Sequence, residues 1–175
     1  MASFRLKPAG TPAKTARNGD TIARLSAIFR DNEIMFGYRV GYLSNYFSGP
    51  VYSVVEAEFG MRRPKFATLF CLAHLGELSA GDICLLSGIP KNSLSRAVNE
   101  LLREKRIRRV ADSADSRRSI LSLTREGRKI YQLILPMFRK RQEAMMAPLS
   151  TREREQFDRL LAKLVLRDDG WNEVY

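Results

Sequence analysis

Residues 79–127, SAGDICLLSGIPKNSLSRAVNELLREKRIRRVADSADSRRSILSLTREG, contain two short helical patterns followed by two short β-rich segments. Ser79 is a favourable N-cap, and Asp82 three residues later completes a capping box, which predicts a helix to about Ser87. Gly88 ends that helix, and Pro90 opens a second helix that runs to about residue 105. Two short helices joined by a glycine-containing turn predict a helix-turn-helix.

A β-hairpin follows the two helices in this pattern. Residues 107–111 and 119–123 are rich in β-branched and other apolar side chains, and the polar segment 112–118 lies between them. Such an arrangement predicts two antiparallel strands with a charged tip. A helix-turn-helix followed by a hairpin is typical of a winged helix-turn-helix, and we expect it over residues 61–124.

Helical patterns continue on both sides of this segment. A helix is expected from residue 63 or 64 to 75, a bent helix from Thr124 to about 146, and a last helix from a Ser150–Glu153 capping box to about 167. Residues 21–60 are helical in pattern, with a kink or restart at Pro50. The expected class is mainly α with a small β-hairpin wing (α+β). Residues 1–20 are expected to be a flexible basic arm, and residues 21–60 and 125–175 a helical dimerisation region.

The second helix of the pair has a polar face suited to DNA. With Leu94, Val98 and Leu101 turned inward, the face left for a major groove carries Lys91, Asn92, Ser93, Ser95, Arg96 and Asn99. Arginine and asparagine can form paired hydrogen bonds with guanine and adenine edges. Lysine and serine more often hold phosphates, which sets register without recognising sequence. The alternative interpretation is an ordinary solvated helix face.

The net charge agrees with a nucleic-acid partner. The chain has 175 residues, a formal charge of +11 and 45% hydrophobic residues. Residues 1–30 carry six Lys or Arg against one Asp, and residues 91–118 carry nine against four acidic residues. Two basic zones indicate phosphate binding, although basic patches also serve anionic membranes and acidic proteins.

The end of the quoted segment resembles a known family signature. Asp115-Ser-Arg117-Arg118, followed by Leu123-Thr-Arg-Glu-Gly127, is similar to the wing signature of the MarR family of bacterial transcription factors, and Leu149-Ser-Thr-Arg-Glu-Arg-Glu is similar to the stretch before the family's last helix. The resemblance extends over about residues 38–165. It implies that Arg117 enters a minor groove, with Asp115 orienting the hairpin tip and Arg118 supporting a backbone contact. The alternative is that Asp115 and Arg117 form a mere surface ion pair.

The chain departs from the family pattern at Arg106. Family members commonly carry glycine between the recognition helix and the first wing strand. If the turn requires a positive φ at that position, a residue other than glycine costs roughly 1 kcal/mol there.

The resemblance further implies a two-fold homodimer, formed through both ends of the chain, that binds an inverted-repeat operator in double-stranded DNA. The long flanking helices are too apolar for one small domain to cover, which also favours a partner subunit. Candidate interface positions are Leu133, Ile134, Met137, Leu160, Leu161, Leu164 and Val165.

Many relatives bind small aromatic or phenolic effectors, so a repressor released by an aromatic carboxylate or thioester is the leading hypothesis. Tyr38, Tyr42 and Tyr46 share a helix face, with Arg39 beside them as a carboxylate anchor, and ordinary packing is the alternative.

Other function classes have little support in the sequence. No apolar run reaches the ~20 residues that a transmembrane helix needs, and the first residues lack a signal-peptide pattern, so a cytoplasmic protein without a membrane partner is expected. Cys71 and Cys84 lack metal-ligand spacing and come with one histidine, so we expect no metal, cofactor or catalytic site. A protein-interaction module on a winged-helix scaffold and a MarR-like regulator without a small-molecule ligand remain alternatives.

Overall fold

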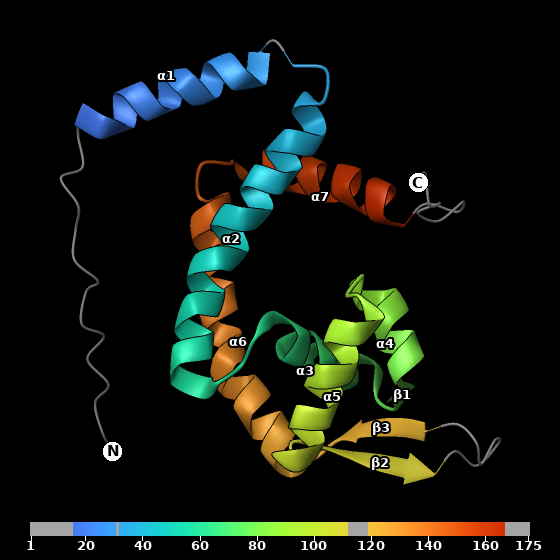
Figure 1. Ribbon diagram of the computed structural model, residues 1–175. Helices are drawn as coiled ribbons and strands as arrows, with labels where there is room; N and C mark the ends of the chain where they lie inside the picture. Colours follow the sequence, from blue (N-terminus) through green and yellow to red (C-terminus); the bar gives the residue numbers. More distant parts are fainter. Residues whose placement is uncertain (1–15, 31, 112–118, 167–175) are drawn as a thin grey trace. The chain divides into compact units, whose positions relative to one another are not determined.

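The computed structural model of the chain describes residues 16–30, 32–111 and 119–166, and Figure 1 shows the order of the elements. The helices and strands are α1 (Ala16–Arg30), α2 (Met35–Phe59), α3 (Arg63–Leu75), β1 (Leu78–Ser79), α4 (Ala80–Ser87), α5 (Lys91–Arg103), β2 (Ile107–Ala111), β3 (Ser119–Leu123), α6 (Arg125–Met146) and α7 (Thr151–Val165). The chain divides into two compact units, with the boundary between Tyr46 and Phe47.

The second unit contains the predicted winged helix-turn-helix. Its sheet is antiparallel, with strand order β1-β3-β2, and β2 and β3 have the bounds that the sequence predicts. Arg109 lies opposite Leu121 in the β2–β3 register, and Leu78 of β1 pairs with the other side of Leu121. The predicted class, mainly α with a small β-hairpin, is confirmed. Strand β1 was not predicted from the sequence, because two residues are too few to show strand alternation.

Side-chain caps begin three of the helices as predicted. Ser79 and Asp82 exchange hydrogen bonds in a complete capping box at α4, and Ser150 and Glu153 do the same at α7. At α6, Thr124 Oγ1 accepts a hydrogen bond from the backbone N–H of Gly127. Each cap satisfies backbone donors that the first helical turn leaves without an intrahelical partner.

The turn from α5 into β2 is a Schellman motif with a lysine in the left-handed position. The Arg106 N–H donates to Leu101 O (2.9 Å), and the Lys105 N–H donates to Leu102 O (3.0 Å). Lys105 has φ 55°, a conformation that favours glycine. The strained residue is therefore Lys105, and the family departure at Arg106 falls one residue beyond the positive φ.

Gly127 allows the start of α6 to approach this turn. A Cβ atom at Gly127 would lie 1.9 Å from the carbonyl oxygen of Arg106. That same oxygen accepts hydrogen bonds from the backbone N–H and the hydroxyl of Thr124, at 3.1 and 2.9 Å. Thr124 and Gly127 of the Leu-Thr-x-x-Gly signature thus join α6 to the base of the hairpin, which only a glycine at the second position permits.

One hydrophobic core holds the second unit together. It combines the last part of α2, α3, the inner faces of α4 and α5, the sheet and the first half of α6. Its fully buried side chains include Val55, Met61, Leu69, Leu72, Ile83, Leu94, Leu101, Ile107, Leu121 and Ile134. Ile134 is therefore core and not the interface position expected from the sequence, because α6 turns it toward this cluster.

The first unit contains a helix break that was not predicted from the sequence. Asn32 accepts a hydrogen bond from the Ile34 N–H (2.8 Å) and donates to Ile28 O (3.2 Å), and α1 and α2 are separated there. Short polar side chains compete in this way with helical backbone bonds. The first helix also begins at Ala16, inside the stretch expected to be an arm. At Pro50, α2 continues as one helix, so the helix does not restart there.

Apolar side chains remain exposed on the last helix. Although α7 has an apolar stripe, none of its residues is buried, and Leu160, Leu161, Leu164 and Val165 are exposed, as is Leu133 of α6. In the described part of the chain, no helix has both the length and the apolar character that crossing a bilayer requires.

Candidate nucleic-acid interface

The polar face of α5 is open to solvent. Leu94, Ala97, Val98 and Leu101 are buried, and the six residues expected to face DNA are all exposed, namely Lys91, Asn92, Ser93, Ser95, Arg96 and Asn99. Residues at four-residue spacing share a helix face, so the buried and exposed sets lie on opposite sides of one helix. The helix therefore presents amides, hydroxyls and cations outward while its apolar side is held by the core.

The turn between α4 and α5 fixes where this face points. Gly88 adopts the left-handed conformation (φ 63°) that ends α4, and its N–H donates to Cys84 O (3.0 Å). Pro90 occupies the N-cap of α5, with the fixed φ that suits the start of a helix. The Ile89 side chain is buried between them, which anchors the turn in the core.

The hairpin beside α5 carries further cations. Arg108 and Arg109 are exposed neighbours on β2, and the Arg109 Nη1 donates to Ser119 Oγ across the ladder (2.8 Å). Arg109 was not among the residues selected from the sequence, because Ile107-Arg-Arg-Val-Ala111 does not alternate apolar and polar residues and so does not show which arginine faces the helices. Asp115, Arg117 and Arg118 of the predicted wing tip lie outside the described residues.

A buried lysine joins α3 to the end of α5. Lys65, with a side chain only 5% exposed, lies 2.6 Å from the Glu104 carboxylate and 3.5 Å from that of Glu100. Its ammonium group also donates to Gly60 O at 3.0 Å. Arg106 pairs with Glu104 at 3.2 Å. We call this set of Lys65, Glu100, Glu104 and Arg106 the polar hub.

Within the polar hub, the cations Lys65 and Arg106 offset the negative charges of Glu100 and Glu104, which lie beside a surface expected to contact phosphates. Glu100 and Glu104 are about one-third exposed, so without partners they would repel a polyanion. The polar hub was not predicted from the sequence, because a lysine within an apolar helix pattern gives no sign of which distant carboxylates it will meet.

The residues predicted to bind an effector are engaged in packing between α1 and α2. Arg39 donates to Phe29 O (3.1 Å) and lies over the Phe29 ring, 5.4 Å from its centroid. Tyr38 and Tyr42 pack edge-on against Phe29, and Tyr46 stacks on Tyr42 at 4.3 Å. A hydrogen bond with Tyr46 raises the pKa of Tyr42. This arrangement favours the packing alternative for the aromatic stripe.

A different aromatic cleft lies in the second unit. It has a volume of about 330 Å³ and is lined by Tyr52 of α2, by the α3 residues Arg63, Phe66, Ala67, Phe70, Cys71, His74 and Leu75, and by Leu86, Ser87 and Ile89 at the end of α4. The imidazole of His74 forms a 2.8 Å hydrogen bond with the hydroxyl of Tyr131. Burial raises the pKa of Tyr52 and, at the edge of the cleft, that of Tyr131. We call this the aromatic cleft.

The cysteines behave as small apolar side chains. Cys71 is buried, and burial raises the pKa of its thiol, which reduces the thiolate fraction that redox reactions need. Within the described ranges, no cluster of three or more His, Cys, Asp or Glu side chains could hold a metal ion.

Comparisons with known proteins agree with this architecture. Residues 59–118 match the family model described as MarR family. No curated protein sequence matches the chain.

Three solved structures illustrate the likeness. The chain is similar to a MarR-family transcriptional regulator from Silicibacter pomeroyi, with 26% identity, a TM-score of 0.66, and coverage of 83% of this chain and 99% of that one. It is similar to S. aureus MepR in a complex with DNA, with 25% identity, a TM-score of 0.67, and coverage of 77% and 97%. Its fold also matches that of BpsR from Bordetella bronchiseptica, whose DNA binding is regulated by 6-hydroxynicotinic acid, with 21% identity, a TM-score of 0.59, and coverage of 72% and 98%.

Proposed function

The chain belongs to the MarR family of transcriptional regulators, and from that premise we propose that it represses transcription by binding an inverted-repeat DNA operator as a homodimer. The observation that carries the proposal is the polar face of α5, where all six selected side chains are exposed above a buried apolar side. A helix of that kind, supported by a second helix and a hairpin, fits the major groove of B-DNA.

The side chains of α5 divide into two roles in this proposal. Asn92 and Asn99 lie nearest the middle of the exposed face, where a carboxamide can form paired hydrogen bonds with an adenine edge. Lys91, Ser93 and Ser95 hold phosphates. From the wing tip, Arg117 enters the adjacent minor groove, where a narrow groove strengthens the attraction for a guanidinium group.

A second copy of the chain covers the exposed apolar side chains of α7 and α6. Leu160, Leu161, Leu164 and Val165 form one stripe at helical spacing, and a stripe of that kind on the surface marks an interaction site. A two-fold dimer places two recognition helices about one helical turn of DNA apart.

Selection from a pool of random DNA duplexes tests this function. We expect recovered sequences to contain an inverted repeat whose half-sites lie about 10 base pairs apart. Asn99→Ala should weaken binding to the selected duplex by roughly 1–3 kcal/mol, while Gln142→Ala, which removes another exposed carboxamide, serves as the matched control on α6. No enrichment of any sequence, with no duplex binding at low salt, would favour the protein-interaction alternative.

We also propose that an aromatic carboxylate releases the repressor by binding in the aromatic cleft. The volume of about 330 Å³ suits a single-ring acid, the walls are mostly apolar, and Arg63 supplies a positive charge. The precedent is BpsR, which responds to 6-hydroxynicotinic acid. To release DNA, the acid must bind the DNA-free arrangement of the dimer more tightly than the DNA-bound one.

Thermal denaturation with 6-hydroxynicotinic acid and related aromatic acids tests the effector site. A ligand at 100 times its Kd stabilises the protein by about 2.7 kcal/mol, which raises Tm by several degrees. Arg63→Gln should abolish the shift, and Arg62→Gln, the neighbouring arginine outside the cleft, should retain it. Equal shifts in both variants contradict this site, and no shift with any aromatic acid contradicts the effector class.

A further inference from the structure

The exposed face of α5 has a middle row and two flanks. Asn92 and Asn99 form the middle row, opposite the buried side chains, and Arg96 lies between this row and the side of α5 that borders α3. One flank borders a cleft toward the start of α3, and the other borders a cleft toward α4 and the hairpin. We call them the α3-side cleft and the wing-side cleft.

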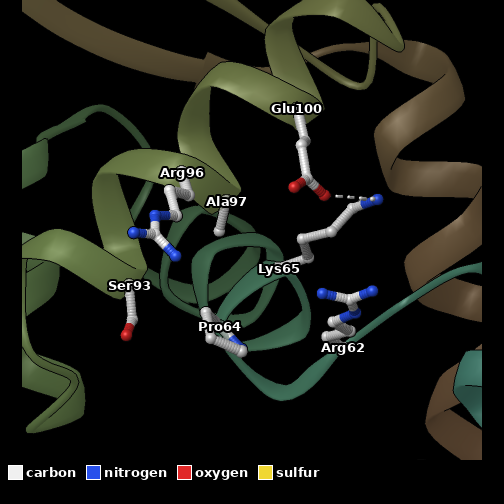
Figure 2. A pocket seen from close by; sticks show the side chains of 7 residues that line it. All are labelled: Arg62, Pro64, Lys65, Ser93, Arg96, Ala97 and Glu100. Atoms are coloured by element: carbon white, nitrogen blue, oxygen red, sulfur yellow. Dashed lines mark ion pairs between the residues drawn. The ribbon is translucent and has the colours of Figure 1, made fainter.

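The α3-side cleft brings several cations together. Its volume is about 160 Å³, and it is lined by Arg62, Pro64, Lys65, Ser93, Arg96, Ala97 and Glu100. Figure 2 shows Arg96 and Ser93 extending from α5 toward the first turn of α3. The carboxylate of Glu100 faces Lys65 at 3.5 Å, so its charge is offset within the polar hub.

Arg62, the other arginine of this cleft, can exchange its carboxylate partner for a DNA phosphate. Arg62 pairs with Glu56 at 2.9 Å, but both side chains are more than half exposed. Exposed ion pairs of this kind contribute little to stability, so a DNA phosphate can replace the Glu56 carboxylate as the partner of Arg62. A second opening, with a volume of about 200 Å³, shares Pro64 and Ser93 with this cleft and adds Arg63.

The wing-side cleft carries cations from two elements. Its volume is about 590 Å³, and its lining includes Lys91, Ser95 and Asn99 of α5 together with Arg109 and Ser119 of the hairpin. Arg109 lies opposite the buried Leu121, and opposed residues point to the same face of an antiparallel pair. Its side chain therefore lies on the face turned toward the helices.

Among the described residues that line the wing-side cleft, the carboxylate is that of Asp82, and it is already hydrogen-bonded. Asp82 accepts hydrogen bonds from the backbone N–H and the hydroxyl of Ser79, at 2.9 and 2.7 Å. The cleft thus combines two cations, Lys91 and Arg109, with one carboxylate that is occupied by a helix cap.

We propose that the two clefts bind backbone phosphates of the two DNA strands that border the major groove. Arg96 and Ser93, supported by Arg62, hold one strand, and Lys91 and Arg109 hold the other. This inference rests on the proposed function. It adds Arg62 and Arg109 to the interface and moves Arg96 from a base edge to the backbone.

The dimensions of helix and groove explain why both flanks meet phosphates. An α-helix with side chains is about 10–12 Å wide, and the major groove is about 12 Å wide. A helix inserted with its middle row toward the bases therefore brings each flank next to a sugar-phosphate strand. Contacts of that kind set register and affinity but not sequence, which leaves base recognition on α5 to Asn92 and Asn99.

The wing-side cleft is tested with two neighbouring arginines. Arg109→Ala and Arg108→Ala remove the same charge from β2, but strand alternation places only Arg109 on the face toward the helices. Binding of a fluorescent duplex of arbitrary sequence, about three helical turns long, is measured by anisotropy over a range of salt concentrations. We expect the slope of log K against log salt to fall by about 0.9 for Arg109→Ala and to stay unchanged for Arg108→Ala. Equal slopes in the two variants would overturn the assignment.

The α3-side cleft is tested with Arg96→Ala, and Arg152→Ala on α7 removes a similar charge as the control. We expect Arg96→Ala to lower the salt slope by about 0.9 and to weaken the selected operator and the arbitrary duplex by similar factors. A loss confined to the operator, with the slope unchanged, would mean that Arg96 contacts a base. Circular dichroism melting verifies that each variant is folded.

These outcomes separate the inference from the proposed function. A wild-type protein that binds no duplex at any salt concentration would overturn both. A wild-type protein that binds its operator, with unaltered slopes in Arg96→Ala and Arg109→Ala, would overturn only the two-cleft inference.

Discussion

Gly127 has no room for a side chain. A Cβ there would lie 1.9 Å from Arg106 O, and that oxygen belongs to the backbone. We expect Gly127→Ala to lower the free energy of unfolding by roughly 3 kcal/mol, because the start of α6 must move away from the turn. Gly81→Ala is the control, since its added Cβ would lie 3.6 Å from the nearest atom, Ser79 Oγ, and alanine favours a helix. Urea denaturation measures both, and an equal effect would contradict the close approach.

At Lys105, a substitution should increase the stability of the protein. Its φ of 55° strains any side chain with a Cβ, and glycine removes that strain. We expect Lys105→Gly to raise the free energy of unfolding by about 0.5–1 kcal/mol. Glycine relieves the strain at positive φ, and its greater conformational entropy in the unfolded chain offsets part of that gain. Lys105→Ala keeps the Cβ and should bring no such gain. Chemical denaturation midpoints distinguish the two substitutions.

At the scale of elements, the polar hub joins α3 to α5. Lys65→Met leaves Glu100 and Glu104 without their shared cation, and we expect a loss of about 1–3 kcal/mol in stability, kept moderate because the carboxylates are one-third exposed. Lys129→Met breaks an exposed pair with Glu126 at 3.9 Å and should cost less than about 0.5 kcal/mol. A denaturant series that ranks the two variants the other way would contradict the role of the buried lysine.

Local signals predicted the elements well and their long-range contacts poorly. Ser79, Gly88, Thr124 and Ser150 act within one turn of helix, so their positions in the sequence indicated where helices begin or end. The pairing of Lys65 with Glu104 spans 39 residues, and no local pattern reports it.

The aromatic stripe on α2 shows the same limit. Four-residue spacing predicted that Tyr38, Tyr42 and Tyr46 share a face. It could not predict that Asn32 would end α1 and let Phe29 pack against two of these rings. On α5, by contrast, helical periodicity alone separated buried from exposed residues, because that helix covers the core with one side only.

For the whole molecule, the exposed leucines of α7 predict a dimer. Leu160→Glu together with Leu164→Glu places charges in the proposed interface, where burying them is costly, so we expect a monomer in analytical ultracentrifugation. Leu85→Glu on α4, at a leucine that is 86% exposed, serves as the control and should remain dimeric. A monomeric wild-type protein, or a dimer that survives both substitutions on α7, would contradict this interface.

The contact at Gly127 also constrains how an effector could act on the proposed repressor. The carbonyl oxygen of Arg106 accepts hydrogen bonds from Thr124 and lies so close to Gly127 that no side chain fits between them. The backbone N–H groups of Lys105 and Arg106 donate hydrogen bonds to α5. Sliding the hairpin along α5 would break these bonds together, so each subunit of the proposed dimer should move as a rigid body. An inducer would then act by changing the distance between the DNA-binding units of the two subunits. Mutations that abolish the effect of the ligand on operator binding should therefore cluster in the long helices rather than in the hairpin.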